Sequence, residues 1–158
     1  MAVLPILHWP DALLSTPCAV APVDDATLTL ARDMLATMYA AQGRGLAAPQ
    51  IGVLLRLFVM DATWKTGSDA PEVFFKPEIL WRSDTMATGP EGCLSIPDVL
   101  TDVTRHTEII LRWTTTEGAI AAQRLTGFRA ICAQHEIDHL DGILTVDRAA
   151  RSPAEAAQ

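Results

Sequence analysis

The sequence predicts an α+β fold, with mostly antiparallel sheets packed around a central C-terminal helix. Two observations predict it. Apolar residues follow helical spacing near both ends of the chain, and the stretch between them consists of short apolar runs separated by turn residues. A helix, several strands and a second helix in this order are typical of α+β proteins.

The first predicted helix lies in the N-terminal quarter of the chain. Asp24 or Asp25 can cap its N-terminus, and Gly43 is expected to end it. Its apolar residues follow 3-4-3 spacing at Leu28, Ala31, Leu35 and Met38.

The middle of the chain contains the predicted strands. Residues 55–60 and 73–80 are apolar runs that indicate buried strands, and the polar residues 61–71 between them indicate a loop. Residues 107–113 and 119–125 flank a T-E-G turn and predict a hairpin.

The last predicted element is a helix that begins near Thr126 and Gly127 and ends by Gly142. Because 158 residues suit one domain with its own core, we expect a single domain over residues 1–148. Residues 149–158 are expected to form a disordered tail.

Composition and charge exclude several classes of protein. A net charge of −7 argues against nucleic-acid binding through a broad basic surface. The N-terminus has no basic region or long apolar run, so no signal peptide is expected, and no stretch approaches the roughly 20 apolar residues of a membrane span. Three cysteines are an odd count for a disulfide framework. These features predict a cytoplasmic protein.

The segment from His135 to His139 reads H-E-x-x-H and lies within the last predicted helix. Positions i and i+4 share one helix face, so both imidazoles can bind one metal ion. Glu136 lies beside them, free to handle the proton of a metal-bound water. The alternative interpretation is a chance pair of histidines on a polar helix face.

A catalytic site of this kind needs about three protein ligands and one open position. In proteases of the metzincin type the third ligand would be a histidine at position 145, which is Thr145 here. His8 lies beside the N-terminus and His106 in a polar stretch, so both are weak candidates. Cys93 is the best remaining donor, because its thiolate would complete a Cys-His-His-water tetrahedron.

Three segments together resemble the signatures of the peptide deformylase family. They are G-R-G-L-A-A-P-Q at residues 43–50, E-G-C-L-S at residues 91–95 and Q-H-E-I-D-H at residues 134–139. They occur in the family's order, and the resemblance extends from about Ile6 to Arg148. It implies a metal-dependent hydrolase that removes the N-terminal formyl group from formyl-methionine of nascent polypeptides.

The resemblance also implies the metal and the partners. The expected ligands are Cys93, His135 and His139. Two imidazoles and one thiolate suit zinc by ligand type and geometry. The family resemblance instead favours Fe²⁺, with Zn²⁺ or Ni²⁺ able to occupy the same ligands. The expected partners are N-formylated nascent peptides at the ribosome exit. The protein is expected to act as a monomer and to bind neither nucleic acid nor membrane.

Roles in catalysis and binding follow from the resemblance as well. Glu136 would act first as general base and then as general acid. The side-chain amide of Gln50 and the backbone N–H of Leu94 would stabilise the oxyanion. Gly45 would expose backbone groups to an extended substrate. The remaining residues expected at the substrate are Arg44, Gly89, Phe128, Ile131 and Cys132.

Other residues near the motifs have structural interpretations. We favour a supporting role near the metal loop for Glu91 over direct ligation, and a helix-anchoring hydrogen bond for Asp138. Cys132 is expected to be a small core or pocket-wall residue rather than a ligand.

Several positions depart from the family pattern. Arg44 stands where an aliphatic residue is usual, Phe128 where a leucine-like residue is common, and Leu100 where many members carry arginine. Neutral drift is one interpretation. The other is a divergent deformylase with altered substrate preference, in which Arg44 narrows or charges the entrance and weakens the binding of methionine.

Two other functions are weighed against a deformylase. An endopeptidase would use the same H-E-x-x-H motif, but Thr145 and the Cys93 segment disfavour it. A non-catalytic protein that binds formylated or other N-termini would have no need of the water-activating Glu136.

Overall fold

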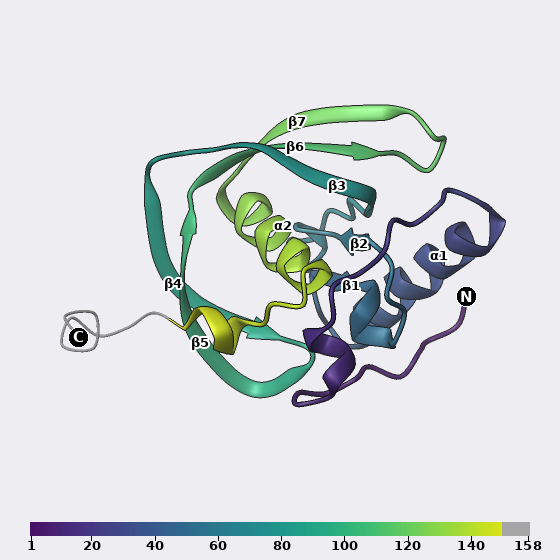
Figure 1. Cartoon of the computed structure of the whole chain (residues 1–158), viewed down its shortest axis with the longest axis horizontal. Coiled ribbons are helices and arrows are strands. Elements are labelled where there is room, and N and C mark those ends of the chain that lie inside the picture. The colour runs from purple at the N-terminus through teal and green to yellow at the C-terminus, as the bar shows by residue number, and fades with distance from the viewer. Residues whose placement is uncertain (150–158) are drawn as a thin grey trace.

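The computed structural model describes residues 1–149 and contains two main helices and two sheets (Figure 1). The helices are α1 (Asp25–Ala40) and α2 (Gly127–Leu140). The strands are β1 (Gly45–Ala47), β2 (Leu57–Met60), β3 (Glu72–Arg82), β4 (Met86–Cys93), β5 (Ile96–His106), β6 (Glu108–Thr114) and β7 (Ile120–Thr126). Short 3-10 helices span Ala12–Ser15, Ala48–Ile51, Trp64–Thr66 and Thr145–Arg148.

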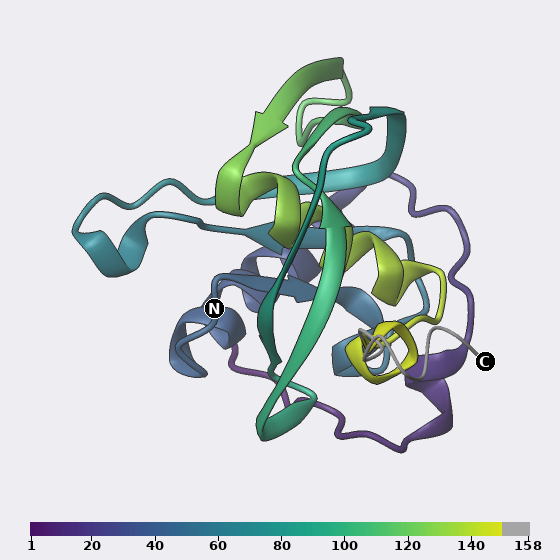
Figure 2. The ribbon, with the colours of Figure 1, turned by 90° about the vertical axis from the view of Figure 1, so that its left-hand side faces the viewer.

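The strands form a five-stranded sheet in the order β1-β2-β3-β6-β7 and a two-stranded sheet of β4 and β5. All pairings between these strands are antiparallel. Figures 1 and 2 show α2 in the middle of the molecule, with strands of both sheets around it. The predicted α+β fold, with antiparallel sheets around the C-terminal helix, is therefore confirmed.

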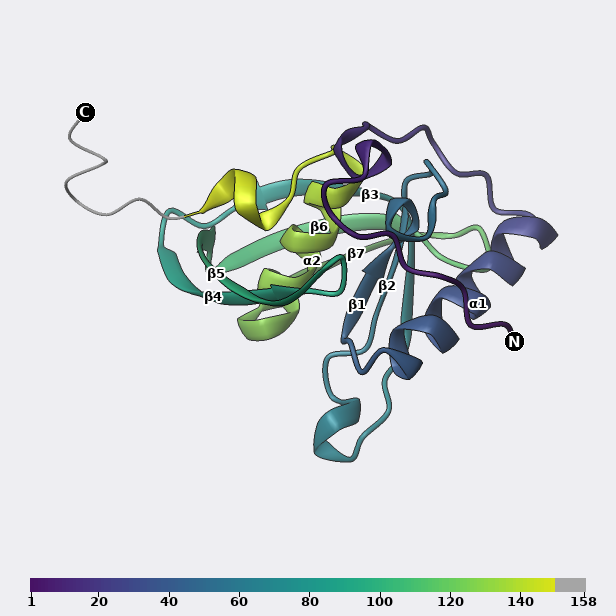
Figure 3. The same ribbon diagram turned by 90° about the horizontal axis from the view of Figure 1, so that it is seen from below.

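The first strands of the larger sheet are apolar throughout because helices cover both of their faces. Successive side chains of a strand point to opposite faces. Phe58 and Phe74 accordingly pack in the core beneath α2, whereas Leu57, Val59 and Phe75 pack in a second core beneath α1. Figure 3 shows α1 and α2 at different sides of these strands. This packing fixes β1, and the chain that leads into it, against α2.

Helix α1 begins as predicted but ends earlier. The Asp24 side chain accepts a hydrogen bond from the Thr27 N–H at 2.9 Å and caps the first turn. The helix ends at Ala40, and Gln42 adopts the left-handed conformation with φ of 58°. The prediction that Gly43 ends the helix was wrong. Gly43 follows this cap, and a Cβ there would lie 2.7 Å from a methyl group of Leu94, so the Leu94 side chain would have to shift.

The strands β1, β4 and β5 are absent from the sequence prediction, whereas β2, β3, β6 and β7 match it. Strand β4 contains two glycines and a proline, residues with low strand propensity. Strand β5 alternates poorly, because several consecutive residues at its start are exposed. Neither strand has a local signal, and both depend on pairing with each other.

Helix α2 has the predicted bounds, and its polar residues are buried. Those below one-tenth exposure are Gln134, His135, Glu136, Asp138 and His139. Burying so many polar groups is costly unless each has a partner. The helix therefore needs hydrogen-bond acceptors and donors from other elements.

The C-terminal boundary is only partly described. Ala149 bridges to Val103 of β5, and the rest of the tail predicted for residues 149–158 lies outside the described residues. Within residues 1–149, no helix has both the length and the apolar character needed to cross a membrane.

Candidate metal centre

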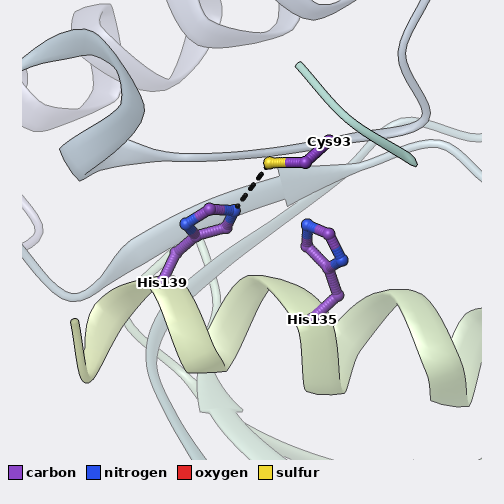
Figure 4. Close-up of side chains that lie close together, drawn as sticks. All are labelled: Cys93, His135 and His139. Carbon is purple, nitrogen blue, oxygen red and sulfur yellow. Dashed lines mark hydrogen bonds between the residues drawn. The ribbon is translucent and has the colours of Figure 1, made fainter. Parts of the chain in front are cut away.

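Cys93, at the end of β4, faces two histidines of α2 (Figure 4). The ligand atoms of Cys93, His135 and His139 all lie within 4.8 Å of one another. The Cys93 Sγ lies 3.4 Å from Nε2 of His139. One sulfur and two nitrogens converge on one point, which suits a divalent transition metal.

A chain of buried charges leads away from this group. Nδ1 of His135 lies 2.9 Å from a carboxylate oxygen of Glu91. Arg105 donates to both oxygens of Glu91, at 2.6 and 2.9 Å, and to Asp138 at 2.8 Å. Arg148 donates to both oxygens of Asp138 at 2.6 and 3.0 Å. A carboxylate bonded to the second nitrogen of a histidine fixes the ring's orientation and leaves the other nitrogen for a metal.

The surroundings set the protonation of the two histidines. Burial acts to lower the pKa of His135, but the charge of Glu136 and hydrogen bonds with Cys93 and Glu91 outweigh it and raise the pKa to about 10. Burial and the charge of His135 hold the pKa of His139 well below its ordinary value. Since a metal binds neutral imidazole, binding would displace a proton from His135.

Burial is also the main reason that the pKa of Glu136 rises to about 7, against the lowering charges of His135 and Arg105. Among residues 1–149, its Oε1 is one of two buried side-chain atoms without a hydrogen-bond partner. A buried carboxyl group with a pKa near neutrality can both accept and donate a proton, and its free oxygen can do so towards a bound molecule.

Gly45 lies directly against Glu136. A Cβ at this position would come within 2.5 Å of Oε2 of Glu136 and 2.8 Å of the sulfur of Cys132. The absence of a side chain therefore lets the backbone of β1 approach the carboxyl group. Strand β1 is an edge of its sheet. The Asp61 N–H donates to the Arg44 carbonyl, and ladder hydrogen bonds alternate, so the N–H and carbonyl of Gly45 point towards the open edge.

The side chain of Gln50 also lies at the metal group. Its Nε2 lies 3.7 Å from the Cys93 sulfur and donates to the Ser95 hydroxyl at 3.1 Å, while its Oε1 accepts from the Ala47 N–H at 2.9 Å. These contacts hold the amide nitrogen towards Cys93. Leu94, the next residue after Cys93, packs its side chain against Gly43.

These residues line a cleft of about 980 Å³. The sequence-predicted residues that line it are Arg44, Gly45, Gln50, Gly89, Cys93, Leu94, Phe128, Ile131, Cys132, His135 and Glu136. His139, the remaining member of the metal group, is buried, with an exposed fraction of 1%. Burial raises the pKa of Cys132 well above its ordinary value, so its thiol stays protonated as part of the wall.

The weaker candidate ligands lie outside the metal group. His8 lines the cleft but does not belong to the metal group, and the ring of His106 contacts the Ser83 carbonyl at 2.6 Å. Thr145 is buried in the last 3-10 helix.

Sequence reasoning missed Arg105, Arg148 and Ser95. Arg105 lies 14 residues from Glu91 and 33 from Asp138, so no local spacing links them. A buried arginine in a strand that faces an H-E-x-x-H helix could be suspected only once β5 is known to pack there.

Comparison with known proteins gives a consistent result. The family model described as polypeptide deformylase matches residues 3–155. A peptide deformylase of Alkalilimnicola ehrlichii is 52% identical over 148 residues, covering 93% of this chain and 82% of its own. The crystal structure of a Synechococcus elongatus peptide deformylase in complex with actinonin has a TM-score of 0.90 at 36% identity, covering 96% of this chain and 83% of its own. A Met-Ala-Ser-bound class I type b peptide deformylase of Acinetobacter baumannii has a TM-score of 0.86 at 33% identity, with coverage of 93% and 98%.

Proposed function

The chain belongs to the polypeptide deformylase family, metal-dependent enzymes that remove the formyl group from N-formylated nascent peptides, and we propose how its own residues perform this reaction. The observation that carries the proposal is the convergence of Cys93, His135 and His139 beside the free carboxylate oxygen of Glu136. The three converging side chains are the proposed metal ligands.

Fe²⁺ is the proposed ion, with Zn²⁺ or Ni²⁺ able to occupy the same ligands. The donor set of one thiolate and two imidazoles accepts each of these ions. A cation held by these side chains would supply Lewis acidity and would lower the pKa of a water molecule at the site towards about 7. The Glu91 carboxylate orients His135 for this purpose, and Arg105 holds Glu91 in turn.

Glu136 carries the proton. As general base it takes a proton from the water that attacks the formyl carbon. It then donates that proton to the nitrogen of the departing amine as the bond between carbon and nitrogen breaks. The products are formate and the free N-terminus. Burial raises the pKa of Glu136 above its ordinary value, which favours its holding the proton between the two transfers.

The proposed oxyanion donors are the side-chain amide of Gln50 and the backbone N–H of Leu94. Gln50 is held by Ala47 and Ser95, so its amide need not reorganise as negative charge develops. Leu94 follows the proposed ligand Cys93 directly, which places its N–H beside the same point.

The peptide is proposed to bind as an added strand along β1. The N–H and carbonyl of Gly45 face the open edge, where they can pair with an extended chain. Gly89 of β4 contributes the opposite wall. The methionine side chain is proposed to enter between Phe128, Ile131 and Cys132, which line the cleft beyond Gly45. Met-Ala-Ser bound to the Acinetobacter baumannii deformylase supports a peptide in this cleft.

The nature of the substrate indicates the cellular setting. A substrate that is a nascent peptide favours action in the cytoplasm, at the ribosome exit. We also propose a single domain that acts as a monomer.

The experiment is the deformylation of formyl-Met-Ala-Ser by protein purified without oxygen and loaded with Fe²⁺. Formate release is expected, and Glu136→Ala should abolish it while retaining metal. Metal content and far-UV circular dichroism of the variant serve as controls. If the wild-type protein binds Fe²⁺ and remains folded but releases no formate, the proposal is wrong.

A further inference from the structure

The side chain of Arg44 reaches from the residue before β1 to the first turn of α2. Its guanidinium carbon lies 3.7 Å from the centroid of the Phe128 ring, and both residues line the cleft. A cation–π contact of this kind holds the guanidinium in place without using its N–H donors. Among residues 1–149, no carboxylate oxygen lies within 4 Å of the nitrogens of the Arg44 guanidinium.

A second cation lies on the same wall. The indole N–H of Trp64 donates to the Gly43 carbonyl at 2.9 Å, which places the residues around Trp64 beside Arg44. Lys65 follows, with its Nζ 5.6 Å from the Trp64 ring, and it also lines the cleft. In the described part of the chain, Lys65 likewise forms no ion pair.

The carboxylates that line the cleft do not neutralise this wall. Glu91 is paired with Arg105, and Glu136 is buried beside the metal group. Asp98 comes from β5, and within residues 1–149 it forms no ion pair with Arg44 or Lys65. Arg44 and Lys65 are therefore the two arginine or lysine side chains that line this cleft, and within residues 1–149 neither is held by a carboxylate within 4 Å. The planar donors of arginine match a carboxylate in a bidentate manner.

The position of Arg44 relates this charge to the substrate. A Cβ at Gly45 would lie 2.5 Å from Oε2 of Glu136, so the formyl-methionine residue on which Glu136 is proposed to act would lie near Gly45. A substrate peptide that continues from this point antiparallel to β1 would pass Arg44 and then Gly43, at about 3.3 Å per residue. We propose that Arg44, assisted by Lys65, selects formyl-methionyl peptides with an acidic side chain at one of the two positions after methionine. This inference rests on the function proposed above.

The test compares glutamate with its neutral isostere glutamine. The substrates are formyl-Met-Glu-Ser-amide and formyl-Met-Ala-Glu-amide, each with a glutamine counterpart, and the amide removes the C-terminal carboxylate. For wild-type enzyme, kcat/KM is expected to be about three- to tenfold higher for glutamate at one of these positions. Arg44→Gln should bring this ratio close to one.

Matched variants separate the local effect from net charge. Arg32→Gln changes the net charge equally but lies on α1, outside the cleft, and should leave the ratio unchanged. Lys65→Gln should reduce the ratio less than Arg44→Gln, and Arg44→Lys should retain part of it. A wild-type ratio of one or below, or a ratio that survives Arg44→Gln, would overturn the proposal.

A binding measurement keeps this inference separate from the proposed function. If formyl-Met-Ala-Ser-amide is not hydrolysed, the function fails. Titration calorimetry of the deformylated peptides Met-Glu-Ser-amide, Met-Ala-Glu-amide and their glutamine counterparts then tests the charge preference alone. Tighter binding of a glutamate peptide that Arg44→Gln removes would support the inference, and equal binding would overturn it.

Discussion

At the metal end of the cleft, Glu91, Arg105 and Asp138 are joined in one chain of ion pairs, whereas at the rim the neighbour of the Arg44 guanidinium is an aromatic ring. The paired side chains are only 4–11% exposed, while Phe128 is 38% exposed. Buried charges need partners because water no longer solvates them. An exposed charge can remain unpaired and so stay available to a substrate. The cleft thus combines a tightly determined catalytic end with a rim that can vary.

Removing a proposed ligand should have the largest effect. Cys93→Ala takes away one of three converging donors, so bound metal per chain should fall from about one to near zero and kcat/KM by a factor of about 10³ or more. Elemental analysis and formate release measure both. Cys18→Ala removes a cysteine outside the group and should retain metal and activity. Full metal content in Cys93→Ala would contradict the assigned ligands.

Breaking the buried chain of charges should have the second-largest effect. Arg105→Met leaves Glu91 with His135 as its remaining partner, and we expect the free energy of unfolding to fall by about 3–5 kcal/mol. Urea denaturation at neutral pH measures it. The control Arg112→Met breaks an ion pair with Glu78 whose side chains are 47% and 57% exposed, and should cost about 1 kcal/mol or less. Equal losses would show that burial does not distinguish the two pairs.

The buried pair of Arg105 and Glu91 predicts that the free energy of unfolding depends on pH. Burial acts to raise the pKa of Glu91, but hydrogen bonds from His135 and Arg105 outweigh it and hold the pKa below its ordinary value. A lowered pKa contributes stability that is present above the ordinary carboxyl value and is lost as the pH falls through the folded-state value. The stability difference between wild type and Arg105→Met should therefore shrink in acid. A difference that grows as the pH falls would contradict this assignment.

Crowding Glu136 should have an intermediate effect. Gly45→Ala places a methyl group 2.5 Å from the Glu136 carboxylate, and kcat should fall by about 10², the order of loss expected for a displaced catalytic group. Steady-state kinetics measure it on metal-loaded protein. Gly89→Ala meets no atom within 4 Å and should cost less. Similar losses for both variants would show that Glu136 adjusts freely.

A substitution at the rim of the cleft should have the smallest effect. Arg44→Ile removes a charge that must lose water when an apolar side chain enters the cleft. For formyl-Met-Ala-Ser-amide, kcat/KM should rise about two- to fivefold, mainly through KM. An unchanged or lower value would favour neutral drift at position 44. A rise on this neutral peptide and a fall on the glutamate peptides would together establish the rim as the site of selectivity.

Local patterns in the sequence were sufficient for part of the structure. The bounds of α2 follow from a helical pattern that ends before Gly142, and the i, i+4 spacing puts His135 and His139 on one face. Strands β2, β3, β6 and β7 follow from short apolar runs. These features depend on neighbours in sequence, so composition and spacing reveal them.

Other features exist only because distant segments meet. The Glu91–Arg105–Asp138 chain joins residues 14 and 33 positions apart, and it forms only when β4, β5 and α2 pack together. The stacking of Arg44 on Phe128 likewise joins the start of β1 to the start of α2. The family, the secondary structure around the motifs and the chemical groups of the site could all be read from the order of the residues. Which charges are paired and which remain unpaired at the cleft could not, because pairing depends on burial and distance, and neither is encoded by local spacing.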